Sequence, residues 1–214
     1  MQEHHLTIPK TARYYSLGEI SKDTNTVWLV CHGYAQLAGE FIKEFESLAA
    51  NDVLIIAPEA LSKFYTKGFF GTVGATWMTK EDRLNEIKDY INYLNTLFLK
   101  IKSEVSPTAQ THILGFSQGC STICRWIAEK NPAYAALWLC SGSIPDDLDF
   151  AKFKNAIEKS PAHYLLGNAD PFIGEKDVLA FEERIKGHQL PLQVHRFTGE
   201  HVLNLQLIQS LVGK

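Results

Sequence analysis

The sequence predicts an α/β fold, in which a mostly parallel, twisted sheet carries helices on both faces. Short apolar runs alternate along the chain with longer segments whose apolar residues recur at helical spacing. Several of the runs are continuous, as in strands that are buried on both faces of a parallel sheet. Serine, aspartate and histidine residues that could carry out chemistry follow directly after several of these runs. In parallel sheets, ligands bind at the carboxyl ends of the strands, which is where these residues would lie.

The size and the composition agree with this fold. The chain has 214 residues, 45% hydrophobic and 21% charged, so we expect residues 1–214 to form a single domain with a sizeable core. The net charge of -3 argues against nucleic acid as a partner. No apolar run approaches the roughly 20 residues of a membrane-spanning helix, and the first residues lack a secretory pattern, so we expect a cytoplasmic location and no membrane span. The sequence does not indicate an oligomeric state.

The cysteines fall at or near the interiors of predicted strands and helices. They are Cys31, Cys120, Cys124 and Cys140. Because they form no Cys-x-x-Cys pair, which would suggest a metal or redox site, we interpret them as small buried hydrophobic residues.

The N-terminal part of the chain is expected to begin the sheet. Residues 5–8 and 13–17 form short alternating runs and are predicted as antiparallel edge strands. The apolar runs 27–31 and 53–57 are predicted as buried strands, separated by an amphipathic helix over residues 40–50.

A long loop over residues 59–78 follows, rich in glycine and aromatic residues, and loops of this length are usually functional. The longest predicted helix then covers residues 80–103. The alternation of strand and helix continues to the C-terminus. Strands are predicted over 111–115, 135–140, 162–167 and 192–198, and helices over 118–130, 146–159, 176–187 and 202–212.

The strand over 111–115 leads into a Gly-x-Ser-x-Gly pattern at residues 115–119, which then opens a helix. A serine on such a sharp turn projects its hydroxyl above the sheet, and Gly115 and Gly119 let the strand and the helix approach closely. Ser117 is therefore the candidate nucleophile, and an ordinary turn serine is the alternative.

A serine nucleophile needs a base and a group that orients the base. His201 lies in a loop between a strand and a helix near the C-terminus, where the chain order serine, acid, histidine places the base. Asp170 follows the penultimate strand in a sharp turn and is the candidate acid. The rivals for the acid, Asp146, Asp147 and Asp149, resemble the start of a helix.

The oxyanion of a tetrahedral intermediate needs backbone donors. In this type of site they come from the residue after the nucleophile, Gln118, and from the loop after an earlier strand, around Tyr34. His32 is expected to brace that loop.

Five segments together resemble the phospholipase/carboxylesterase branch of the α/β-hydrolases, which includes the acyl-protein thioesterases. They are Cys31-His32-Gly33-Tyr34, Trp77 ahead of a long helix, Gly115-Phe116-Ser117-Gln118-Gly119, Gly167-Asn168-Ala169-Asp170-Pro171 and Gly199-Glu200-His201. The resemblance spans nearly the whole chain. It implies an α/β-hydrolase fold without a large separate lid, a triad of Ser117, Asp170 and His201, and oxyanion amides at Tyr34 and Gln118. It also implies that Trp77 is a wall of the acyl or alcohol pocket, and it implies no metal or cofactor.

The chain departs from the family pattern in two places. Residues 34–39 replace a glycine-rich stretch, and Glu200 precedes the histidine. The aromatic segment from Phe64 to Trp77 favours an apolar substrate site, so Phe69 and Phe70 join Trp77 as candidate substrate contacts. The alternative is that these aromatic residues cap the core.

The sequence therefore predicts a serine hydrolase that acts on a small-molecule carboxylic ester or thioester through an acyl-enzyme intermediate. Lysophospholipase and peptidase activities share the same triad and remain alternatives. A binding protein that retained the fold without catalysis is the alternative from another class.

Overall fold

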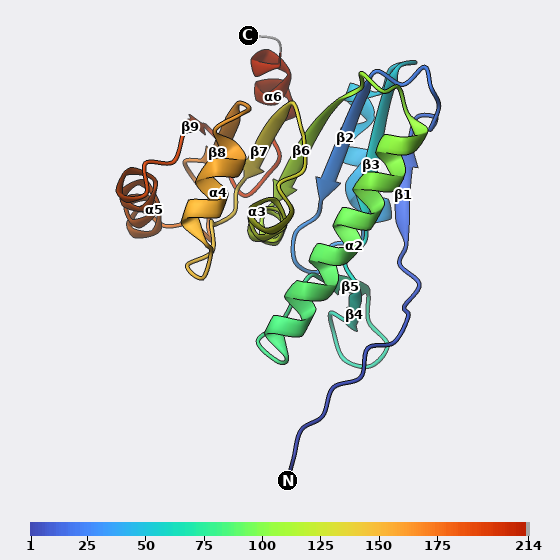
Figure 1. Ribbon diagram of the computed structural model, residues 1–214. Coiled ribbons are helices and arrows are strands. Elements are labelled where there is room, and N and C mark those ends of the chain that lie inside the picture. The colour runs from blue at the N-terminus through green and yellow to red at the C-terminus, as the bar shows by residue number, and fades with distance from the viewer. Residues whose placement is uncertain (213–214) are drawn as a thin grey trace.

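A computed structural model describes residues 1–212 of the chain and contains one large mixed sheet (Figure 1). The strand order is β1-β3-β2-β6-β7-β8-β9. Its strands are β1 (Tyr14–Leu17), β2 (Thr26–Cys31), β3 (Val53–Pro58), β6 (Gln110–Phe116), β7 (Ala136–Cys140), β8 (Ala162–Gly167) and β9 (Leu192–Phe197). The edge strand β1 pairs antiparallel with β3, and the other neighbours pair in parallel. The carboxyl ends of the parallel strands therefore meet at one edge.

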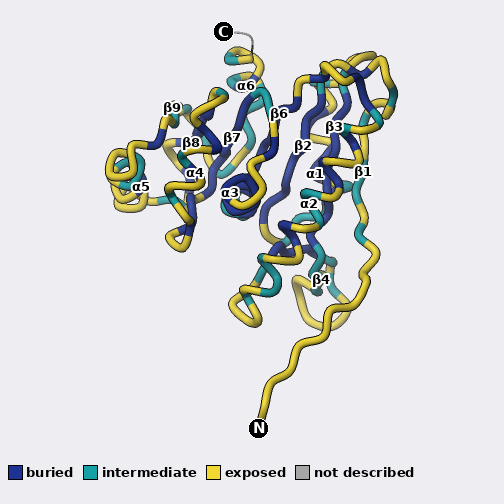
Figure 2. Tube along the Cα trace, viewed as in Figure 1, coloured by how far each residue is buried: buried dark blue, intermediate teal, exposed yellow. Residues whose placement is uncertain are grey.

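Helices cover both faces of the sheet, as the sequence predicts. One face packs against α2 (Arg83–Glu104), α3 (Gln118–Lys130), α4 (Phe150–Ile157) and α5 (Glu175–Gly187). The other face packs against α1 (Ala38–Phe41), the 3-10 helix η1 (Ile42–Leu48) and α6 (Leu205–Leu211). Figure 2 shows the consequence: the central strands are buried along most of their length, whereas the outer faces of the helices are exposed.

Three sequence expectations about elements were wrong. Residues 5–8 form no strand, because the chain meets no sheet edge before β1. The expected long loop over 59–78 contains a hairpin of β4 (Ser62–Tyr65) and β5 (Val73–Thr76). The helix expected over 40–50 is a short α-helix followed by η1.

The four cysteines are buried, as predicted, and each is free. Burial raises the pKa of each thiol, to about 12 for Cys120, so these side chains stay protonated and pack as small hydrophobic groups.

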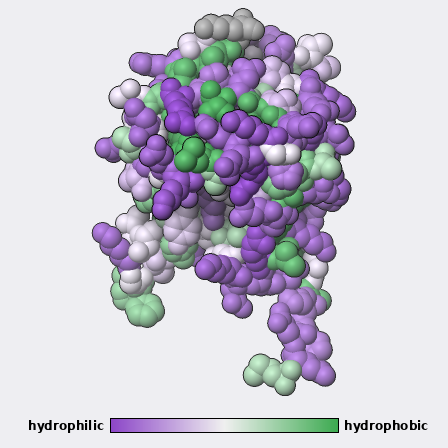
Figure 3. Space-filling model, turned by 90° about the vertical axis from the view of Figure 1, so that its left-hand side faces the viewer, coloured by the Kyte–Doolittle hydropathy of each residue, from purple (hydrophilic) through white to green (hydrophobic). Residues whose placement is uncertain are grey.

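Within residues 1–212, none of the helices combines the length and the apolar character that a bilayer crossing requires. Figure 3 turns the α5 and β9 side of the molecule toward the viewer, and hydrophilic side chains predominate there, with hydrophobic side chains gathered in smaller patches. Strand β9 lies at this edge of the sheet and is correspondingly less buried than the central strands.

Candidate active site

The carboxyl edge of the sheet brings the candidate residues together. Tyr34 follows β2, Ser117 follows β6, Asp170 follows β8 and His201 follows β9. In the sheet order these strands are neighbours or are separated by β7 alone. The parallel pairing therefore places side chains that lie far apart in the sequence at one edge, which is the lower edge of the sheet in Figure 1.

Ser117 sits on a sharp turn between β6 and α3, with φ 52 and ψ -117, a conformation that non-glycine residues rarely adopt. The turn works because its flanking glycines leave room. A Cβ atom on Gly115 would lie 2.6 Å from the carbonyl oxygen of Gly119, and one on Gly119 would overlap the carbonyl oxygen of Cys31 in β2. The backbone N–H of Ser117 donates to the Cys140 carbonyl at 2.9 Å, which fixes the turn against β7.

Asp170 and His201 form a short hydrogen bond, with 2.7 Å between Asp170 Oδ2 and His201 Nδ1. The other carboxylate oxygen accepts the backbone N–H of Phe172 at 2.9 Å, so both oxygens of this buried side chain are engaged. The imidazole also packs between two rings, with centroid distances of 5.0 Å to Phe116 and 4.8 Å to Phe172. Because an ionised carboxylate only accepts hydrogen bonds, Nδ1 is the donor in this pair, and the neutral form of the imidazole then has its lone pair on Nε2.

Ser117 and His201 line one cavity of about 450 Å³. The other lining residues are Gln118, Ser121, Ser141, Gly142, Ser143, Tyr164, Phe172, Ile173, Asp177 and Phe181. Among the described residues, no hydrogen bond joins the Ser117 hydroxyl to His201. Such contacts are often long in substrate-free sites and shorten when substrate binds.

The candidate oxyanion donors lie beside Ser117. Gln118 is the first residue of α3, so its backbone N–H has no acceptor within the helix and lies at the positive end of the helix dipole. The loop after β2 reaches the same place, since a Cβ atom on Gly33 would lie 3.0 Å from Ser117 Cβ. Tyr34 follows Gly33 directly. The Gly33 N–H donates to Gln36 Oε1 at 2.7 Å, which orders this loop internally.

His32 links the loops that follow β2 and β3. Its Nδ1 contacts the Gly33 carbonyl at 2.7 Å, and its Nε2 accepts the Ala60 N–H at 3.1 Å. Burial lowers the pKa of this imidazole. It is therefore neutral, with its proton on Nδ1, and braces the Tyr34 loop as the sequence analysis expects.

The aromatic residues expected to contact substrate lie elsewhere. Trp77 is buried, and its indole N–H donates to the His32 carbonyl at 2.9 Å. Phe69 and Phe70 are 86% and 97% exposed in the turn between β4 and β5. None of the three lines the cavity beside Ser117, so their role as substrate contacts stays a prediction.

The apolar part of the cavity wall comes from residues that the sequence analysis did not single out. Phe172 and Ile173 follow the Asp170 turn, and Phe181 projects from α5. The first two could have been inferred, because they directly follow the candidate acid. Phe181 could not, because its place at the cavity depends on how α5 packs.

The three rival aspartates have other partners. Asp149 accepts the Lys152 N–H at 3.0 Å and caps α4. Asp146 pairs with Arg184, and Asp147 pairs with two further arginines. Asp170 remains the acid in hydrogen-bond contact with His201.

Within the part of the chain that the structure describes, one group of three potential metal ligands is close enough to hold an ion: Glu3, His5 and Asp82. All three are exposed, and none lines the cavity. They are therefore separate from the candidate chemistry at Ser117.

Comparisons with known proteins support the fold. No family model matches the chain, and no curated protein matches it by sequence. Solved structures do match. The crystal structure of esterase PE8 has a TM-score of 0.68 at 18% identity and covers 94% of this chain and 96% of that chain. Acyl-protein thioesterase 2 of Zea mays has a TM-score of 0.68 at 15% identity, with 94% and 96% coverage.

A phospholipase/carboxylesterase from Dyadobacter fermentans also matches, with a TM-score of 0.68, 15% identity, and coverage of 97% of this chain and 99% of that chain. The chain therefore has the α/β-hydrolase fold. These similar structures are described as an esterase, an acyl-protein thioesterase and a phospholipase/carboxylesterase, which matches the family that the sequence resembles. At these identities the likeness shows the fold alone.

Proposed function

We propose that this chain is a serine hydrolase that cleaves carboxylic esters or thioesters through an acyl-enzyme intermediate on Ser117. The observation that carries the proposal is the 2.7 Å hydrogen bond between His201 Nδ1 and buried Asp170, beside a cavity that Ser117 and His201 both line. A strained serine, an oriented imidazole and a buried carboxylate on neighbouring strand ends match the roles of nucleophile, base and acid.

In the proposed first step, Ser117 Oγ attacks the carbonyl carbon of the substrate and His201 Nε2 accepts the hydroxyl proton. The carbonyl oxygen becomes an oxyanion, and the backbone N–H groups of Tyr34 and Gln118 donate to it. The bond from the carbonyl carbon to the alcohol oxygen or the thiol sulfur then breaks. The leaving group takes the proton from His201, and the acyl group stays on Ser117 as an ester.

In the proposed second step, water attacks the acyl-enzyme while His201 Nε2 accepts one of its protons. The tetrahedral intermediate collapses to the free acid, and the proton returns to Ser117 Oγ. Asp170 stays ionised throughout, orients the imidazole and stabilises its charged form.

The cavity favours a neutral acyl group, because Phe172, Ile173 and Phe181 provide an apolar wall. We therefore propose small acyl esters and thioesters as substrates, and lysophospholipase and peptidase activities on the same triad as alternatives. The proposal includes a cytoplasmic location, which the free cysteines of the described residues support, because disulfides are rare there.

A fluorophosphonate probe tests the nucleophile. We expect the probe to label the wild-type protein covalently and to leave Ser117→Ala unlabelled, as measured by intact mass. Ser121→Ala and Ser143→Ala remove other hydroxyls of the cavity and are expected to keep the label. A folded wild-type protein that the probe does not label would show that the serine is not activated, and would favour the alternative of a non-catalytic binding protein.

A further inference from the structure

The cavity beside Ser117 lies between two walls from different parts of the chain. One wall is the loop over residues 141–149, called here the β7–α4 loop, which contributes Ser141 and Ser143. The other wall is α5, which contributes Asp177 and Phe181. The distance between these walls sets the width that the cavity offers to a substrate.

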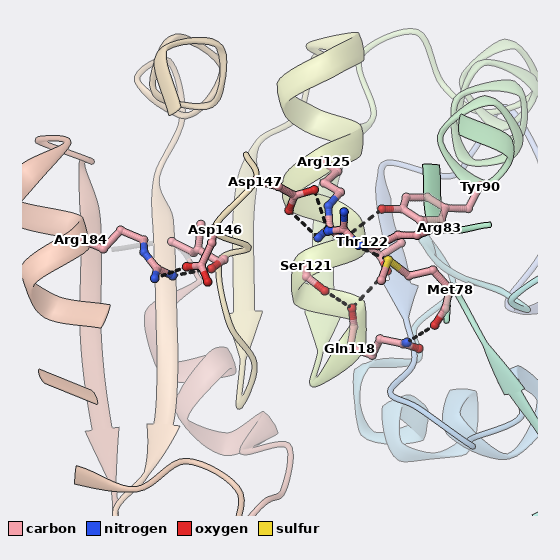
Figure 4. Close-up of polar contacts among 11 residues, drawn as sticks. Met78, Arg83, Tyr90, Gln118, Ser121, Thr122, Arg125, Asp146, Asp147 and Arg184 are labelled. Atoms are coloured by element: carbon pink, nitrogen blue, oxygen red, sulfur yellow. Dashed lines mark hydrogen bonds and ion pairs between the residues drawn. The ribbon is translucent and has the colours of Figure 1, made fainter. Parts of the chain in front are cut away.

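The β7–α4 loop is anchored on one side by Asp147. Its two carboxylate oxygens bind Arg83 at 2.7 Å and Arg125 at 2.8 Å, which come from α2 and α3 (Figure 4). Arg125 is largely buried and also donates to the Tyr90 hydroxyl at 3.4 Å. Burial alone would raise the pKa of Asp147, but the two arginines outweigh it and lower the pKa below its usual value. This side of the loop is therefore tied to the helical layer independently of α5.

On the other side, Arg184 connects the loop to α5. Its Nη1 donates to the Ile144 carbonyl at 2.8 Å, and its Nη2 pairs with the Asp146 carboxylate. Figure 4 shows Arg184 and Asp146 on the opposite side of the loop from the Asp147 cluster. Arg184 lies three residues after Phe181, so both side chains project from the same side of α5. One guanidinium therefore spans the two walls of the cavity.

Helix α5 is otherwise attached to the sheet and the core by its buried side chains, by Ile185 packed against the core, and by an ion pair of Glu182 with Arg196 of β9. Of its residues, all of which the structure describes, Val178 and Phe181 are the buried ones. Phe181 stacks on Tyr164 with the ring centroids 4.0 Å apart. The contacts of Phe181 and Glu182 hold α5 to β8 and β9, so the distance of the helix from the β7–α4 loop can still change when Arg184 is removed.

We propose that Arg184 is a positioning residue that sets the acyl specificity of the cavity by fixing the separation between α5 and the β7–α4 loop. The inference rests on the proposed function, because it assigns the cavity to the acyl group. With Arg184 in place, the cavity favours slender acyl chains over branched ones. Without it, α5 moves away from the loop and the discrimination falls.

The test compares p-nitrophenyl hexanoate with p-nitrophenyl pivalate, which is branched beside the carbonyl. In Arg184→Met, which keeps the apolar stem, we expect the ratio of kcat/KM for pivalate over hexanoate to rise about tenfold, a typical effect of pocket shape. The change should appear in KM, with kcat for p-nitrophenyl acetate within about threefold of wild type. Arg184→Lys should restore part of the wild-type ratio, since it keeps the charge and one donor.

Arg83→Met is the matched control. It removes an arginine from the other side of the same loop, where Arg125 still holds Asp147, and should leave the ratio unchanged. A ratio that is unchanged in Arg184→Met, or that shifts equally in Arg83→Met, would overturn the inference while the proposed function stands. Failure of folded wild type to react with the fluorophosphonate probe or any ester would overturn the proposed function and this inference with it.

Discussion

At the scale of single residues, Asp170 connects the candidate base to the backbone. One carboxylate oxygen holds His201 and the other accepts the N–H of Phe172, whose ring packs against the same imidazole. The carboxylate, the turn after β8 and the imidazole therefore form one unit. A substitution that displaces any one of these three parts is therefore expected to change the orientation of the imidazole relative to Ser117.

Asp170→Asn tests this unit. An asparagine can fill the same space, but its amide group can donate to Nδ1 and so favour the wrong imidazole tautomer. We expect kcat for p-nitrophenyl acetate to fall by about 10³ to 10⁴-fold with folding retained. Asp89→Asn, at an exposed position of α2, is the control and should leave kcat unchanged. A loss below about tenfold in Asp170→Asn would contradict the role of orienting acid.

The positions of Ser117, Asp170 and His201 at the ends of strands could be predicted from the sequence, because each residue follows a recognisable strand. A strand that ends at Gly167 and turns at Pro171 exposes Asp170 in one defined place. The substrate contacts could not be predicted in the same way. Trp77 donates its indole N–H to a backbone carbonyl in the interior and Phe69 is exposed in the hairpin turn, so their role as substrate contacts stays a prediction.

At the scale of elements, the turn at Ser117 depends on close packing of β6, α3 and β2. Gly119, at the start of α3, lies against the carbonyl of Cys31 in β2 and that of His32 directly after it, so the helix approaches the strand more closely than any side chain would allow. Gly187, at the end of α5, has no heavy atom within 4 Å of where its Cβ would lie.

Gly119→Ala and Gly187→Ala therefore form a matched pair. We expect Gly119→Ala to lower the free energy of unfolding by about 1–3 kcal/mol or more, because the new methyl group overlaps backbone atoms. Gly187→Ala should raise it by up to about 1 kcal/mol, because alanine restricts the unfolded chain and suits a helix. Urea unfolding measures both values. Equal effects of the two substitutions would contradict the close approach at Gly119.

The elements that differ from the sequence prediction have weak or misleading local patterns. Strand β5, Val73–Thr76, contains glycine and alanine, and it forms by pairing with β4 over the register Ser62↔Thr76 to Tyr65↔Val73. Residues 5–8 show the opposite case, because they alternate like a strand and find no partner. Pairing decides both outcomes, and a local pattern does not contain it.

At the scale of the whole molecule, the sheet order creates a row of rings that no single segment contains. Trp28, His112, Trp138, His163 and His195 lie on the successive strands β2, β6, β7, β8 and β9. Trp28 stacks on His112 at 4.4 Å, and Trp138 stacks on His163 at 4.3 Å. The sequence shows alternating strands and helices, but the order of the strands, and hence this row, follows from packing.

Hydrogen bonds also connect the row. The Trp138 indole, which can only donate, contacts His112 Nδ1 at 3.3 Å, so His112 accepts there and is neutral. His163 Nδ1 and His195 Nε2 lie 3.1 Å apart, a bond that requires a lone pair on one of the two nitrogens. Among the described residues, the ion pairs that involve histidine belong to His5 and His201, so no carboxylate compensates a charge in the row.

The row predicts that acid destabilises the fold. Burial lowers the pKa of His112 to about 4, and burial together with His195 lowers the pKa of His163 to about 4. An unfolded histidine titrates near pH 6.5, so between about pH 6.5 and 4 the unfolded chain binds more protons than the folded chain. The stabilisation is therefore complete above pH 6.5 and is lost as the pH falls toward 4. His112, the more deeply buried of the two, contributes roughly 3 kcal/mol to this loss, and His163 contributes less.

Urea unfolding between pH 7.5 and 4.5 should show the free energy of unfolding nearly constant at the upper end and falling steeply below about pH 6.5. His163→Phe keeps a ring against Trp138 but removes one titrating group. The slope of its unfolding free energy against pH should therefore be smaller than that of wild type, by an amount that corresponds to at most one bound proton. His188→Phe, at an exposed position, is the matched control and should follow the wild-type slope. If the free energy of unfolding of the wild-type protein stays constant down to pH 4.5, protonation of these histidines does not destabilise the fold, and the prediction is wrong.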